Sequence, residues 1–133
     1  LVGSEMCIRD RCMETLIIMS LVLAILQLWL IPMTIDIKNL NWMIGNRDSS
    51  IPQSPLVTRA KRAGANLQES LPAFLALALL SMILSIDVTN AACWWLIFRV
   101  AHGVFYIGGI KYLRTIAYFG SIGSLIAMAC ALI

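Results

Sequence analysis

The sequence predicts an all-α integral membrane protein that folds as a bundle of four transmembrane helices. Hydrophobic residues occupy 60% of its 133 positions and charged residues only 13%, whereas soluble domains average about 25% charged residues. The mean hydropathy is +0.86. A soluble core of this length has no room for so much apolar surface, so lipid must solvate most of the chain.

Four apolar runs are each long enough to cross a bilayer, which takes roughly 20 helical residues. They cover residues 16–35, 67–86, 91–110 and 116–133. The long connection between the first two runs contains Pro52 and Pro55. We therefore expect the second helix to begin after Pro55 and to project from the membrane before entering it. The connections 87–90 and 111–115 are short, which favours antiparallel neighbours.

Residues 1–12 differ from the rest of the chain, because they are mixed in charge and have no periodicity. They look like a translated adapter or cloning scar, and we expect a single membrane domain over residues 13–133, with Met13 as its start. Cys93 and Cys130 lie in apolar runs without metal-ligand or CxxC spacing, so we interpret both as small hydrophobic residues.

The basic residues predict the orientation of the chain in the membrane. Under the positive-inside rule the first and third loops face the cytoplasm and both termini face the other side. A nucleic-acid footprint is excluded, since the basic residues lie beside the bilayer. Tryptophan and tyrosine near the helix ends are expected to form an interfacial belt. The basic loop residues are Lys38, Arg47, Arg59, Lys61, Arg62, Lys111 and Arg114, and the belt residues are Trp29, Trp42, Trp94, Trp95, Tyr112 and Tyr118.

One polar cluster lies at the entry of the second helix. At about 100° per residue, Arg62, Asn66 and Glu69 project within roughly 60° of one another, and Arg59 sits a turn earlier. Asn and Glu are poor lipid-facing residues, so this stripe faces another helix or a cavity. An interhelical network and a ligand site both remain open.

A second cluster, Arg99, His102 and Tyr106, shares one face of the third helix. Arg99 lies roughly 12 Å into the apolar region, where an unpaired charge costs at least about 3 kcal/mol. Glu69 is the acidic residue deepest in a predicted span, so we expect an Arg99–Glu69 contact. His102 is either a satisfied interior histidine or a base, and Arg114 by position alone is a membrane anchor.

Together the clusters describe an arginine-rich pocket that opens to the cytoplasmic half of the bilayer. Guanidinium groups bind carboxylates bidentately, so the pocket suits a small anionic ligand with several carboxylates. A metal site is not expected, because the chain has one histidine and no paired carboxylates.

The pattern Arg-x-x-Arg-Ala-x-x-Asn-x-x-Glu-x-x-Pro over residues 59–72, with the third-helix set and Leu113-Arg114, resembles the MAPEG family of membrane-associated proteins in eicosanoid and glutathione metabolism. The short chain resembles bacterial-type members. The resemblance implies a homotrimer, in the bacterial inner membrane, that binds glutathione as co-substrate between protomers near the cytoplasmic face. The residues that it implies contact glutathione are Arg62, Asn66, Glu69, His102, Tyr106 and Arg114, with Arg59 nearby and Arg99 structural or ligand-facing.

The same resemblance implies a reaction. Arg114 would stabilise the glutathione thiolate, since a free thiol near pKa 8.5 is mostly protonated at neutral pH. The second substrate would be a lipophilic electrophile or a lipid hydroperoxide from the bilayer. A non-catalytic lipid-binding or scaffold protein would use the same pocket, so the sequence leaves both functions open. A transporter is disfavoured, because the four helices have no internal symmetry.

Overall fold

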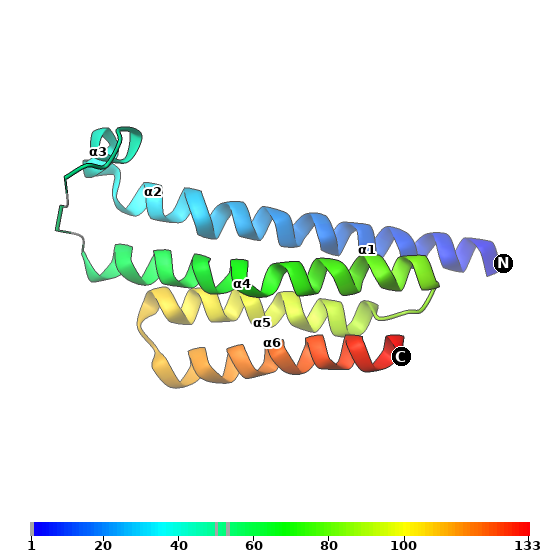
Figure 1. Ribbon diagram of the computed structural model, residues 1–133. Helices are drawn as coiled ribbons and strands as arrows, with labels where there is room; N and C mark the ends of the chain where they lie inside the picture. The colour runs from blue at the N-terminus through cyan, green and yellow to red at the C-terminus, as the bar shows by residue number, and fades with distance from the viewer. Residues whose placement is uncertain (1, 50, 53) are drawn as a thin grey trace.

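The computed structural model describes residues 2–49, 51–52 and 54–133, with side chains described from Arg11 onward. Four long rods lie side by side with alternating direction, and both termini are at the same end (Figure 1). The first rod is continuous through three elements, and two short helices follow it. The elements are α1 (Val2–Ile25), η1 (Leu26–Leu30), α2 (Ile31–Ile35), η2 (Ile37–Asn39), α3 (Leu40–Ile44), α4 (Pro55–Leu84), α5 (Thr89–Gly108) and α6 (Lys111–Leu132).

The predicted fold class is confirmed. Within the described residues, four helical stretches are long and apolar enough to cross a membrane. They are Arg11–Ile35, Pro55–Leu84, Thr89–Gly108 and Lys111–Leu132. Each stretch overlaps most of one predicted run, because the length of an apolar segment is set by the thickness of the bilayer.

Two helices, α4 and α6, begin at positions that need a separate explanation, because polar residues precede their apolar runs. Pro55 occupies the first turn of α4, and the Ser54 side chain caps that turn by accepting a hydrogen bond from the backbone N–H of Val57. Residues 111–115, which were predicted to connect the third and fourth helices, are the first residues of α6. The connection consists of Gly109 and Ile110. Gly109 has φ +77°, a conformation that glycine adopts without strain. Arg114 therefore projects from the first turn of a helix.

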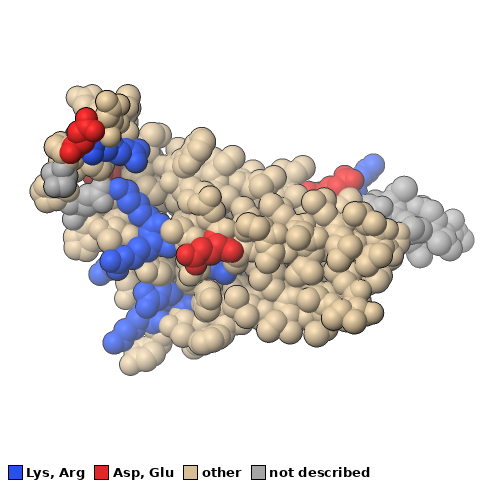
Figure 2. Space-filling model, in the orientation of Figure 1, with Lys and Arg blue, Asp and Glu red and all other residues tan. Residues whose placement is uncertain are grey.

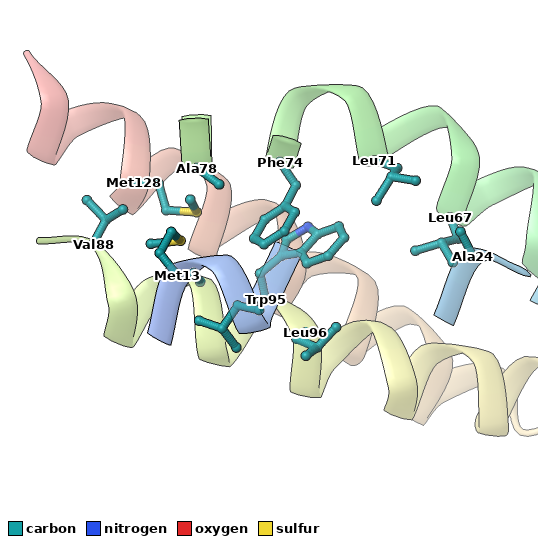
Figure 3. Packing of buried hydrophobic residues seen from close by; sticks show 12 residues of the cluster. Met13, Ala24, Leu67, Leu71, Phe74, Ala78, Val88, Trp95, Leu96 and Met128 are labelled. Carbon is teal, nitrogen blue, oxygen red and sulfur yellow. The ribbon is translucent and has the colours of Figure 1, made fainter. Parts of the chain in front are cut away.

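The core lies between the rods and is centred on a pair of aromatic rings. Phe74 of α4 and Trp95 of α5 are stacked with ring centroids 4.0 Å apart, and neither side chain is exposed (Figure 3). Trp95 thus belongs to the core, and its assignment to the interfacial belt was wrong. The error arose because proximity to a helix end says nothing about which face of the helix carries the residue. Trp94, its sequence neighbour, is exposed as a belt residue should be.

The first rod is distorted where it packs most closely against α4 and α5. The π-helical segment η1 contains Gln27, whose side chain is only 4% exposed. A Cβ added to Gly64 would lie 2.8 Å from the Gln27 carbonyl oxygen, and one added to Gly103 would collide with Gln27 Nε2. The two glycines therefore let three rods approach one another at one level.

The Gly64→Ala substitution is expected to destabilise the protein by about 1–3 kcal/mol, because the new methyl group meets a backbone atom that cannot rotate away. The matched control is Gly123→Ala in α6, where an added Cβ has no atom within 4 Å. That change should be neutral or stabilising by up to about 1 kcal/mol. Thermal unfolding in detergent compares the two, and equal midpoints would contradict the close packing at Gly64.

Candidate functional site

Basic side chains gather at one end of the bundle. Figure 2 shows Lys and Arg concentrated where α4 begins and where α5 passes into α6, at the end away from both termini. The remainder of the visible face is almost uncharged. This basic end contains Arg47, Arg59, Lys61, Arg62, Lys111 and Arg114.

Arg99 is the buried cation among the residues whose side chains the structure describes. Its side chain is 1% exposed, and Nη1 donates a hydrogen bond of 2.6 Å to Oδ1 of Asn66 on α4. The guanidinium carbon lies 5.5 Å from the Tyr118 ring centroid and 5.9 Å from that of Trp95. The aromatic faces of α5 and α6 thus surround the charge and stabilise it by cation–π attraction.

The expected Arg99–Glu69 pair does not form as a hydrogen-bonded contact. Nε and Nη2 of Arg99 are buried without a hydrogen-bond partner in the described residues, and Glu69 acts on Arg99 only electrostatically. The carboxamide of Asn66 takes the place that the carboxylate was expected to fill. The Glu69 side chain projects about 60° further around α4 than that of Asn66, so it lies outside the contact between α4 and α5 and is exposed.

Aromatic rings connect Arg99 to Arg114. The His102 side chain is 3% exposed, and its ring centroid lies 5.5 Å from that of Tyr106 and 6.1 Å from that of Tyr118. The Arg114 guanidinium carbon lies 4.6 Å from the Tyr106 ring centroid. A row of side chains therefore runs from the buried Arg99 to the half-buried Arg114 at the start of α6.

The remaining predicted residues lie on α4. Arg59 and Arg62 are exposed, as is Glu69. The Arg59 side chain crosses to the turn between α5 and α6, where a Cβ on Gly109 would lie 2.8 Å from Nη1 of Arg59. The structure thus brings Asn66, Arg99, His102, Tyr106 and Arg114 into one row and leaves Arg62 and Glu69 on the adjoining surface of α4.

Sequence reasoning missed two residues at this level of the bundle. Tyr118 was assigned to the interfacial belt, but it packs against both Arg99 and His102. Its spacing of four from Arg114 on one helix was the available signal. The other is Gln27, whose Oε1 is buried without a hydrogen-bond partner in the described residues. An amide in the middle of an apolar run was its signal.

The comparisons with known proteins point to one family. The sequence model of the MAPEG family matches residues 16–133, which is nearly the whole chain. Comparison with curated proteins finds no match.

Proposed function

The chain belongs to the MAPEG family, and from this membership and the geometry of the basic end we propose that it binds glutathione and uses it against lipophilic substrates. Membership itself places the protein among multi-pass membrane proteins of glutathione or eicosanoid metabolism. The specific proposal is the conjugation of electrophiles, or the reduction of lipid hydroperoxides, through a thiolate that Arg114 stabilises.

The observation that carries the proposal is the row of contacts from Asn66 and Arg99 to Arg114 at the basic end. Its groups complement glutathione, which has two carboxylates, an ammonium group, two peptide bonds and a thiol. Arg59 and Arg62 are exposed guanidinium groups suited to the carboxylates. Glu69 is an exposed carboxylate beside them, suited to the ammonium group. Asn66, His102 and Tyr106 supply the neutral polar contacts in this proposal.

Arg114 is placed to act on the thiol. Stacking on Tyr106 restricts its planar guanidinium group, and its half-buried position strengthens its field relative to that of a fully hydrated cation. A fixed cation next to sulfur favours the thiolate, and the thiol proton passes to water. The thiolate then either displaces a leaving group from carbon, forming a C–S bond, or attacks a hydroperoxide oxygen, breaking the O–O bond. In the second case another glutathione completes the reduction, giving the alcohol, water and glutathione disulfide.

The proposal includes an assembly and an orientation. Arg62 and Glu69 are exposed in the single chain, and in a homotrimer with glutathione between protomers a neighbouring chain would cover them. The basic end faces the cytoplasm, as the positive-inside rule requires, in the bacterial inner membrane. Glutathione would enter from the cytoplasm and the second substrate from the bilayer.

Calorimetric titration of glutathione into detergent-purified protein, run beside turnover assays, tests the function. We expect binding at millimolar glutathione or below, and consumption of glutathione with a chlorodinitrobenzene-type electrophile or a lipid hydroperoxide. Absence of binding at millimolar concentrations would refute the proposal. Binding without turnover of either substrate would replace it with a non-catalytic lipid-binding or scaffold role for the same fold.

A further inference from the structure

A groove at the basic end lies outside the row of contacts described above. It has a volume of about 660 Å³ and lies between the end of the first rod and α3. None of the residues proposed to contact glutathione lines it. Most of its lining is apolar and includes Leu28, Trp29, Met33, Leu40 and Met43. The groove is therefore a separate feature that the proposed function does not use.

Two cationic side chains of this groove lie near one aromatic ring, that of Trp42. The Arg47 guanidinium carbon lies 5.8 Å and the Lys61 Nζ 5.9 Å from the ring centroid of Trp42, and all three residues belong to the lining. Arg47 also donates from Nε to the Met43 carbonyl oxygen, and Trp42 donates from Nε1 to that of Ser49. Hydrogen bonds thus hold Arg47 and Trp42, and Lys61 lies near the same ring. Neither cation forms an ion pair with a carboxylate in the part of the chain that the structure describes.

The groove also adjoins the bilayer. Trp29 is 73% exposed and Ile44 75% exposed, and both line it. Trp29 lies near the end of the first membrane-spanning stretch, where tryptophan favours the interface between lipid and water. An occupant must therefore be amphiphilic, with an apolar chain along the lining and a negative charge at Arg47 and Lys61. Glutathione has no such chain.

We propose that this groove binds an anionic phospholipid from the leaflet at the basic end of the bundle. One acyl chain lies along Trp29, Met33 and Met43, and the phosphate lies between Arg47 and Lys61. Paired cations beside an apolar surface near the membrane interface are suited to lipid head groups. Each cation contributes about 1 kcal/mol to the attraction of an anionic lipid. Removing one cation should therefore weaken binding about fivefold, and removing both about 30-fold.

Native mass spectrometry of the full chain in detergent, titrated with phosphatidylglycerol or phosphatidylcholine, tests the site. We expect one phosphatidylglycerol per chain, bound at least about tenfold more tightly than phosphatidylcholine. The double variant Arg47→Ala/Lys61→Ala should lose about 30-fold in phosphatidylglycerol affinity and a much smaller factor in phosphatidylcholine affinity, so that it binds the two lipids about equally. Glycerol phosphate, which has a phosphate but no chain, should not compete.

The matched control is Lys38→Ala/Lys111→Ala, which removes two charges from the same end outside the groove. Lys111 also lies over an aromatic ring, 5.4 Å from the Tyr112 centroid. This control should change phosphatidylglycerol affinity less than about twofold. Met33→Trp, which fills the groove and keeps both cations, should abolish the specific site while leaving glutathione binding as in the wild type.

Three outcomes would overturn the inference. Equal affinity of the wild type for the two lipids would show that Arg47 and Lys61 do not select the head group. Equal losses of phosphatidylglycerol affinity in the two double variants would show that the lipid is attracted by the whole basic end and not by this groove. Undiminished binding to Met33→Trp would show that the lipid lies elsewhere. None of these results bears on glutathione binding, so the inference and the proposed function fail separately.

Discussion

Replacing Arg114 with alanine is expected to lower glutathione-dependent turnover at least about 100-fold while the bundle stays folded. The expected size follows from losing a fixed charge beside the atom on which negative charge develops. Arg114 is half-buried in the first turn of α6 and stacks on Tyr106, so no flexible lysine of the surface can replace it. Initial rates of thiol consumption under saturating glutathione measure the effect.

The control for Arg114 lies in the same helical turn. Lys111→Ala removes an exposed cation that stacks on Tyr112 and contacts none of the proposed glutathione residues. Turnover in that variant should stay within about twofold of the wild type, whereas Arg114→Lys should give an intermediate rate, because it keeps the charge and loses the planar group. Wild-type turnover in Arg114→Ala would remove this residue from the mechanism.

The Asn66→Leu substitution should lower the free energy of unfolding by about 3 kcal/mol. It deletes the acceptor for Nη1 of Arg99, whose other two guanidinium nitrogens already have no hydrogen-bond partner in the described residues. A buried charge that loses its partner is strongly destabilising. Chemical or thermal unfolding in detergent measures the loss.

Gln68→Leu is the comparison for Asn66→Leu, because it makes the same change from amide to leucine on the exposed side of α4. Its effect should stay within about 0.5 kcal/mol. Equal unfolding midpoints for the two variants would show that the Arg99–Asn66 hydrogen bond contributes nothing to stability.

Hydropathy predicted the number and order of the spans, because each follows from the bilayer acting on one segment at a time. The short connections predicted that neighbouring spans run in opposite directions. The start of α4 lies next to the boundary that Pro55 predicted, whereas the start of α6 depends on the Gly109 turn and was not predicted. Arg114 was therefore expected as an anchor in a loop, whereas it lies in a helix with its side chain over the ring of Tyr106.

Helical periodicity grouped Arg62 with Asn66 and Glu69, and Arg99 with His102 and Tyr106. It could not predict which member of one stripe meets which member of the other, because that depends on the register between α4 and α5. Asn66 rather than Glu69 meets Arg99 for this reason.

The sequence analysis also missed residues that the first and fourth rods contribute to the interior. Tyr118 of α6 was assigned to the interfacial belt, yet it packs on Arg99. Gln27 continues the stripe of buried residues Met13, Leu16, Ser20 and Ala24 at ordinary helical spacing, so periodicity could have placed it in the interior.

Ultraviolet difference absorbance of the thiolate, recorded on mixing the detergent-purified protein with saturating glutathione at neutral pH, tests the central claim most directly. We expect a thiolate signal in the wild type and none in Arg114→Ala, even where calorimetry shows that the variant still binds glutathione. A wild-type protein saturated with glutathione that gives no thiolate absorbance would contradict it.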